Sequence, residues 1–209
     1  MATGDKVVLA TSNAGKVREL AEPLAALGVE VLGLDSFPEI GEIVEDGDSF
    51  EANALIKARV VAAHTGLVSI ADDSGLETDA LHGAPGIHSA RYADDWEFLA
   101  GESRDARNIR KLLHVLRDVP EAERGCRFVC CMAVVFPPSL GGREWTVRGA
   151  WEGRLLTAPR GENGFGYDPV FWDAELGRSA AELTREEKMG RSHRGRALGA
   201  LLAAWPDKP

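Results

Sequence analysis

The chain has few cysteines, no long apolar stretch and fewer basic than acidic residues, and each shortage excludes a class of protein. Of its 209 residues only three are cysteine, namely Cys126, Cys130 and Cys131. Their spacing matches no standard zinc pattern, and a cytosolic setting argues against disulfides, so we expect three buried free thiols. No segment approaches the roughly 20 apolar residues that a membrane-spanning helix needs, so we expect no membrane partner.

The charge balance is acidic. With 33 Asp and Glu against 24 Lys and Arg, the formal net charge is −9. Proteins that bind a nucleic-acid backbone carry a basic surface, so we expect no nucleic-acid partner. A small anionic ligand in a locally basic pocket is compatible with this charge. Residues 1–5 show no signal-peptide pattern, which predicts a cytoplasmic protein.

What the sequence does contain is an apolar run that leads into acidic residues. Residues 68–71 predict a buried strand, and Asp72, Asp73, Ser74 and Gly75 follow it. We expect the strand to stop at the carboxylates, which would place them at the edge of the sheet. Ligands of open α/β sheets bind in the crevice beyond such strand ends. Carboxylate oxygens in that position suit Mg²⁺. The same four residues also favour a surface turn without any ligand.

A second polar stretch lies between the first expected strand, residues 6–10, and a helical pattern. It comprises Thr11, Ser12, Asn13, Ala14, Gly15 and Lys16. Free N–H groups and the positive end of the helix would face an anion there, and Lys16 adds a charge. The glycine spacing is not that of a Walker A loop. An ordinary strand–helix connection explains this stretch equally well.

An acidic stretch and a helix precede the strand at residue 68. Residues 39–48 form a solvated loop, or else they supply a carboxylate to a metal site. The candidates for that carboxylate are Glu39, Glu42, Glu45, Asp46 and Asp48. The following residues predict a helix that Ser49 caps and that ends before Gly66. Asn53 and Lys57 are one turn apart and share a side of this helix.

The last third of the chain has two features that suit nucleotide binding. Phe165 and Tyr167 stand among glycines, where their rings could stack on a flat base, although such sequences also form packed corners. Ser192 can cap a final helix, which would put His193 and Arg194 at its positive end. A lone histidine is usually structural, but a His-Arg pair at a helix start suits an anion.

In this order and spacing the motifs resemble the inosine/xanthosine triphosphate pyrophosphatase family, the Ham1-like proteins. The resemblance covers nearly the whole chain. It is carried by residues 11–16, 53–58, 71–76, 83–86, 89–92, 164–169, 181–184, 186–188 and 192–194. It implies one α/β domain over residues 1–209, with a mixed β-sheet in two lobes, flanking helices and a central active-site cleft.

The resemblance also implies an activity. Members of the family hydrolyse deaminated purine triphosphates (ITP, dITP and XTP) to the monophosphate and pyrophosphate, use Mg²⁺, and are typically homodimers. This reaction cleanses the nucleotide pool. A related pyrophosphatase acting on modified pyrimidines or on the standard triphosphates is the alternative enzyme. A nucleotide-binding regulator without catalysis is the alternative of a different class.

Transferred position by position, the family site has three parts. Asp73 would be the base or metal ligand that sets up the attacking water, and Glu45 its metal-binding partner, with Glu42 and Asp46 as rivals. The triphosphate would be held by Thr11, Ser12, Asn13, Ala14, Gly15 and Lys16. The other substrate contacts would come from Ser74, Phe165, Gly166, Tyr167, Asp168, Lys188, His193 and Arg194. Ala52 departs from the family pattern, because many relatives have a glutamate there.

Overall fold

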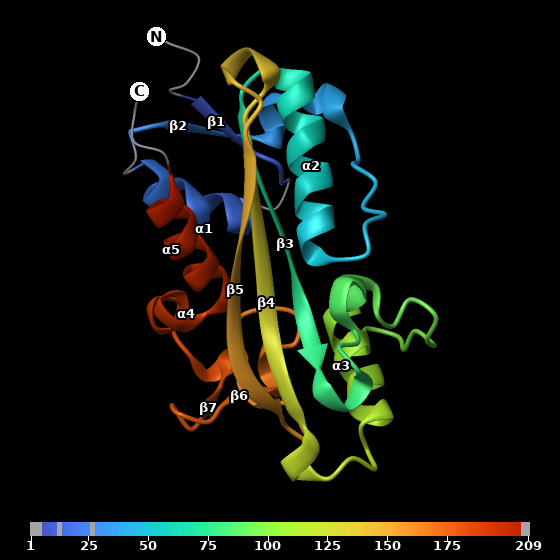
Figure 1. Cartoon of the computed structure of the whole chain (residues 1–209). Helices are drawn as coiled ribbons and strands as arrows, with labels where there is room; N and C mark the ends of the chain where they lie inside the picture. The colour runs from blue at the N-terminus through green and yellow to red at the C-terminus, as the bar shows by residue number, and fades with distance from the viewer. Residues whose placement is uncertain (1–5, 12–13, 26–27, 206–209) are drawn as a thin grey trace. The chain divides into compact units, whose positions relative to one another are not determined.

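The computed structural model describes residues 6–11, 14–25 and 28–205. Its strands form a seven-stranded sheet in the order β2-β1-β3-β4-β5-β6-β7 (Figure 1). The strands are β1 Lys6–Leu9, β2 Glu30–Gly33, β3 Val68–Thr78, β4 Gly125–Val135, β5 Glu144–Leu155, β6 Phe171–Asp173 and β7 Arg178–Ser179. The helices are α1 Ala14–Ala25, α2 Phe50–Thr65, α3 Arg104–Val115, α4 Arg185–Arg191 and α5 His193–Ala204.

The sheet is mixed. β1 is parallel to both β2 and β3, whereas β6 is antiparallel to both β5 and β7. The expected α/β class, a mixed sheet with flanking helices, is therefore confirmed. The chain separates into two compact units: unit 1 comprises residues 1–73, 130–149 and 197–209, and unit 2 comprises residues 74–129 and 150–196.

Alternation along the strands of unit 1 creates two separate cores. Successive side chains of a strand point to opposite faces of the sheet. Val7, Leu9 and Ile70 belong to a core with α1 and α5, whose buried members include Leu20, Leu24, Leu198 and Leu201. Val8, Ala10 and Ala71 belong to a second core with α2, through Ala54, Ala58, Val61 and Ala62. Thus α1 and α5 cover one face of the sheet and α2 covers the other (Figure 1).

Helix α2 begins and ends where the sequence predicts. Ser49 Oγ accepts the N–H of Ala52, and Gly66 follows the last turn in a left-handed conformation with φ 67°. A cap of the Ser49 type stabilises a helix by about 1 kcal/mol. Two polar residues of this helix, Asn53 and Lys57, are buried next to the alanines that pack on the sheet. Their side chains therefore face the sheet as well.

Unit 2 has its own core and a charged sheet surface. Its buried residues include Leu76, Phe128, Trp151 and Phe171 from the strands and Ile109 and Leu112 from α3. On the surface, Arg127 Nη1 lies 3.6 Å from Glu77 Oε2 and Nη2 lies 2.8 Å from Asp79 Oδ1.

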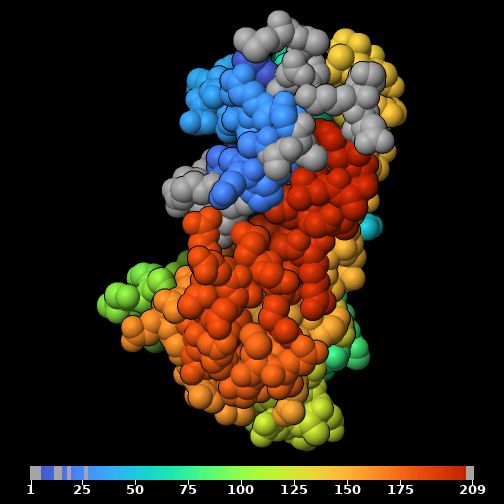
Figure 2. Space-filling model, turned by 90° about the vertical axis from the view of Figure 1, so that its left-hand side faces the viewer, coloured from blue at the N-terminus to red at the C-terminus, as the bar shows by residue number. Residues whose placement is uncertain are grey.

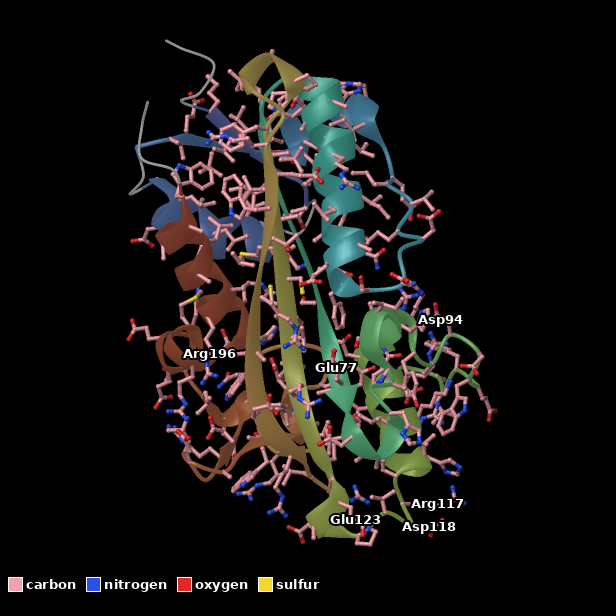
Figure 3. All side chains as sticks on the ribbon, viewed as in Figure 1. Glu77, Asp94, Arg117, Asp118, Glu123 and Arg196 are labelled. Atoms are coloured by element: carbon pink, nitrogen blue, oxygen red, sulfur yellow. The ribbon has the colours of Figure 1, made fainter. Side chains whose placement is uncertain are left out.

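Figure 3 shows Glu77 on β3 and, farther along the chain, Asp94 before α3. Asp94 Oδ2 lies 2.5 Å from Arg104 Nη2.

Strand β3 corrects one expectation from the sequence. It does not stop at the carboxylates, and no surface turn forms there: the strand continues from Val68 to Thr78 through Asp72, Asp73, Ser74 and Gly75. It is β1 that ends at this level, at Leu9, with the N–H of Ala10 donating to Ile70 O at 2.8 Å. The other neighbour of β3 in the sheet is β4, which is 11 residues long like β3 itself. Pairing along the sheet thus overrides the turn preference of these residues.

Two further expectations concern cysteines and membranes. The three cysteines are buried free thiols, as the sequence predicts. None of the helices in the described part of the chain is both long and apolar enough to cross a membrane.

Candidate active site

Two side chains of α2 reach Asp73. Lys57 Nζ lies 3.0 Å from Glu45 Oε2 and 3.7 Å from Asp73 Oδ1, so one ammonium group joins two carboxylates. Asn53, one helical turn earlier, donates from Nδ2 to Asp73 Oδ2 at 3.1 Å. The spacing of four residues puts Asn53 and Lys57 on the same side of the helix. We call Glu45, Asn53, Lys57 and Asp73 the acidic group.

The loop that carries Glu45 is tied to α2 by the same asparagine. Gly47 N–H donates to Asn53 Oδ1 at 2.9 Å. A Cβ at Gly47 would lie 2.7 Å from that oxygen, so the loop can approach the helix closely only because residue 47 is glycine. This contact holds Glu45 near the helix. The rival carboxylates Glu42 and Asp46 are exposed.

The environment of Asp73 changes its acidity. Burial raises the pKa of the Asp73 carboxyl above its ordinary value of 3.8, and Lys57 and Asn53 offset part of that rise.

Among residues 6–11, 14–25 and 28–205, no group of three or more His, Cys, Asp or Glu side chains could hold a metal ion. The acidic group offers two carboxylates, however, and Mg²⁺ is usually bound by one or two carboxylates plus substrate phosphates.

Asp72, the neighbour of Asp73 on β3, pairs with Lys16. Lys16 Nζ lies 3.0 Å from Asp72 Oδ1 and 2.9 Å from Oδ2, and Asp72 is 4% exposed. Asp72 lies on the same side of β3 as Ile70, which packs in the core with α1. Asp73 lies on the same side as Ala71, which packs in the core with α2. The two neighbouring carboxylates therefore pair with different lysines, and the charge of Lys16 also lowers the pKa of Asp73.

A cavity of about 710 Å³ in unit 1 lies beside both lysines. Its polar and charged lining residues are Thr11, Lys16, Asp35, Glu42, Glu45, Lys57 and Asp72. The structure thus brings Thr11 and Lys16 of the expected phosphate loop to the same cavity as Glu45. Of the other expected residues, Ser12 and Asn13 lie outside the described part of the chain. Ala14 and Gly15 form the first turn of α1.

In unit 2, two cations lie against the ring of Phe165. Lys188 Nζ is 5.1 Å and Arg194 Cζ is 5.8 Å from the ring centroid, and the phenylalanine is 56% exposed. Arg194 Nη2 also donates to Ser74 Oγ at 3.4 Å. Figure 2 shows the surface of unit 2 on the side of α4, in orange. An exposed ring beside two cations suits a flat molecule that carries negative charge.

Asp168 holds the segment that presents Phe165. It is 2% exposed, and its Oδ2 accepts the N–H of Phe165 at 2.9 Å and pairs with Lys188 Nζ. Gly164 makes this arrangement possible: its φ is +81°, and a Cβ there would lie 2.0 Å from Asp168 Oδ2. Asp168 therefore contacts both the backbone of Phe165 and one of the two cations.

Gly166 and Tyr167 are also fixed by contacts within unit 2. Gly166 N–H donates to Asp105 Oδ2 at 2.7 Å. Tyr167 is 4% exposed, and its hydroxyl donates to Ser89 O at 2.8 Å. Burial raises the pKa of that hydroxyl above its ordinary value of 10.0, which keeps it protonated as a donor. Of the two aromatic residues in this segment, only Phe165 presents its ring to solvent.

His193 and Arg194 begin α5, as the sequence predicts. Ser192 Oγ accepts the N–H of Gly195 at 3.1 Å and so caps the helix. His193 is 6% exposed and stacks on Phe128 with a centroid distance of 5.0 Å and an interplanar angle of 22°. Contacts in unit 2 therefore connect Arg194 with Phe165 and Ser74, and Lys188 with Phe165, whereas His193 packs on Phe128.

Comparison with known proteins places the chain in a family. The sequence model of the Ham1 family matches residues 7–204. The chain belongs to the Ham1 family. It is 57% identical to the dITP/XTP pyrophosphatase of Nitratidesulfovibrio vulgaris over 200 residues, which are 96% of this chain and 95% of that protein.

Solved structures of Ham1 proteins show the same fold. A HAM1 protein from Coxiella burnetii has a TM-score of 0.85 at 39% identity, covering 95% of this chain and 96% of that one. The nucleoside-triphosphatase / dITP/XTP pyrophosphatase from Mycobacterium abscessus has a TM-score of 0.76 at 48% identity, covering 94% of this chain and 98% of that one.

Three polar residues of this Ham1 protein contact the expected site residues but have no role in the site transferred from the family. They are Asn53, Lys57 and Asp72. The helical spacing of Asn53 and Lys57 signals a shared face, but it does not show that this face meets Asp73. Asp72 looks equivalent to Asp73 in the sequence, and only the alternation of β3 separates their roles.

The raised pKa of Asp73 makes stability depend on pH. The folded state binds this proton more tightly than the unfolded chain, so the contribution of Asp73 to stability falls as pH rises from 3.8 through the raised folded pKa. We therefore expect metal-free Asp73→Asn to melt at a higher temperature than the unsubstituted protein at pH 7. The difference should vanish below pH 3.8. Thermal unfolding across this pH range measures it.

Asp46→Asn is the matched control for this comparison, because it removes an exposed carboxylate from the same unit. Its melting temperature should follow that of the unsubstituted protein at each pH. A lower melting temperature for Asp73→Asn at neutral pH would contradict the account of Asp73.

Proposed function

We propose that this protein is a Mg²⁺-dependent nucleoside triphosphate pyrophosphatase that converts ITP, dITP and XTP into the monophosphate and pyrophosphate. The single observation that carries the proposal is the acidic group, in which Lys57 joins Glu45 and Asp73 in a chain of the Ham1 family. Relatives named dITP/XTP pyrophosphatase supply the substrate class. Removing deaminated purines from the nucleotide pool is the cellular role that follows.

Glu45 and Asp73 are the residues that would hold Mg²⁺. Both are hard oxygen donors, and the contact of Glu45 with Lys57 supports it over Glu42 and Asp46. When bound, the metal neutralises phosphate charge and makes a bound water more acidic. Asn53 would keep the Asp73 carboxylate oriented through its hydrogen bond to Oδ2.

Asp73 would act as the base. Asn53 and Lys57 hold its carboxylate in place, and a positioned carboxylate can accept a proton from water. It would take a proton from a water molecule as the water oxygen bonds to the α-phosphorus. The bond from that phosphorus to the bridging oxygen then breaks, and pyrophosphate leaves in one piece. The reaction adds charge to phosphate oxygens, so catalysis depends on placing cations around them.

Lys16 and the start of α1 would bind the triphosphate. Free N–H groups at a helix N-terminus attract anions. In the structure Lys16 pairs with Asp72. A phosphate would compete with Asp72 for this ammonium or share it. Thr11 of the same cavity, together with Ser12, Asn13, Ala14 and Gly15, completes the proposed phosphate loop.

The base and sugar would be bound by unit 2. The exposed ring of Phe165 offers a stacking surface, with Lys188 and Arg194 beside it. Donors of His193 or Arg194 would favour the 6-oxo group of hypoxanthine and xanthine over the 6-amino group of adenine. Ser74 would act with Arg194, its hydrogen-bond partner. For Asp168, Gly166 and Tyr167, the contacts support a role in shaping the segment around Phe165.

We also propose a cytoplasmic homodimer, because members of the family are typically dimers and the nucleotide pool is the source of the substrate. Light scattering of the full chain in solution tests the assembly. We expect twice the mass of one chain. The mass of a single chain at micromolar protein concentration would contradict the dimer.

A panel of triphosphates with Mg²⁺ tests the proposed reaction. We expect ITP, dITP and XTP to release pyrophosphate and no orthophosphate, at higher kcat/KM than ATP, GTP or pyrimidine triphosphates. Asp73→Asn should lower turnover by about 10²- to 10⁴-fold, the usual contribution of a positioned acid or base. Pyrophosphate and orthophosphate must be measured separately.

Asp118→Asn is the control for the substitution. Asp118 is an exposed carboxylate after α3 (Figure 3), so its replacement should leave turnover unchanged. Full activity of Asp73→Asn would overturn its role. Preference for a standard or pyrimidine triphosphate would point to the related enzyme instead, and binding without release of pyrophosphate would point to a regulator.

A further inference from the structure

Phe128 is the one aromatic residue of β4, and its ring lies against His193. The two rings are nearly parallel, with a centroid distance of 5.0 Å and an angle of 22°. Both residues are buried, each 6% exposed. The ring nitrogens of an imidazole donate and accept in the plane of the ring. A surface that fixes this plane therefore also fixes the directions in which His193 can form hydrogen bonds.

Phe128 is itself held in place by other aromatic rings. Phe171 lies 4.5 Å and Trp151 6.3 Å from it, centroid to centroid, and Trp151 lies 4.7 Å from Phe171. Phe171 and Trp151 are almost fully buried. Such packed rings have little freedom to tilt, because protein interiors are close-packed. We call these three residues the aromatic platform.

A chain of polar contacts links the same platform to the backbone before His193. Trp151 Nε1 donates to Asp173 Oδ2 at 2.9 Å. Arg191 Nε donates to the same oxygen at 3.1 Å. Arg191 ends α4 and stands two residues before His193. The platform therefore restrains both the ring of His193 and the segment that leads into it.

We infer that Phe128 is a positioning residue that sets the orientation of His193 and thereby the preference for 6-oxopurines. This inference rests on the proposed function, in which His193 contacts the base. Phe128 does not itself touch the substrate. It acts by keeping the imidazole plane in the orientation that suits a 6-oxo acceptor. Without the phenyl ring the imidazole can tilt, and His193 then discriminates less between a 6-oxo and a 6-amino group.

The test is a double-mutant cycle between Phe128→Leu and His193→Ala in the full chain. The measured quantity is the ratio of kcat/KM for ITP to that for ATP. We expect Phe128→Leu to lower this ratio by roughly tenfold, as expected for a misplaced substrate-contacting group. In the His193→Ala background the same substitution should have no further effect. Phe128→Met, which refills the space differently, should behave like Phe128→Leu.

A spectroscopic readout reports the orientation directly. The protons of the His193 ring lie over an aromatic face, so their NMR signals should be shifted upfield by the ring current of Phe128. His193→Ala identifies these signals among the five histidines of the chain. In Phe128→Leu we expect them to move back towards ordinary histidine positions.

Leu116→Val controls for a general loss of packing, because Leu116 is buried in the same core as the platform. It should lower the melting temperature without changing the substrate ratio. If His193→Ala lowers the ratio but Phe128→Leu leaves it unchanged, the inference is wrong and the proposed function stands. If His193→Ala leaves the ratio unchanged, the proposed base contact is wrong, and the role of Phe128 falls with it.

Discussion

The ammonium group of Lys57 holds together two carboxylates that would otherwise repel each other. Lys57 is only 9% exposed, and a buried charge is tolerated only when it is paired and hydrogen-bonded. Both conditions are met, since Nζ lies 3.0 Å from Glu45 and 3.7 Å from Asp73. The alanines of α2 bring the helix close to the sheet, and this packing sets where the ammonium lies. The electrostatics of the proposed metal site thus depend on the core of unit 1.

The alternation of β3 explains why two adjacent aspartates have different surroundings. Ile70 and Asp72 point towards α1, and Ala71 and Asp73 point towards α2. Had these residues formed a turn, no such division would follow. Because they lie in an extended strand, one carboxylate meets Lys16 near the proposed phosphate loop and the other meets Asn53 and Lys57. Each carboxylate has its own cation, which limits the repulsion between them.

Local signals in the sequence were sufficient for many elements and for the separate parts of the proposed site. Ser49, Gly66 and Ser192 mark helix ends because capping is a local interaction. The continuation of β3 could not be predicted, since Asp-Asp-Ser-Gly favours a turn and only pairing with distant strands overrides it. The short helix α4 is not among the elements expected from the sequence, although Thr184 and Glu187 form a capping box. The stacking of Phe128 on His193 depends on tertiary structure, and no pattern along the chain reveals it.

Glu45 and Asp73, joined by Lys57, are the proposed metal site. Binding of Mn²⁺ to the full chain, in the presence of an ITP analogue with an unreactive α,β-methylene bridge, tests it most directly by electron paramagnetic resonance of the free ion. We expect Glu45→Gln to weaken Mn²⁺ binding by roughly tenfold or more, since even residues that support a metal ligand contribute about that much. The neighbours Glu42→Gln and Asp46→Asn should leave it nearly unchanged. Equal Mn²⁺ affinity of Glu45→Gln and the unsubstituted protein would contradict the account.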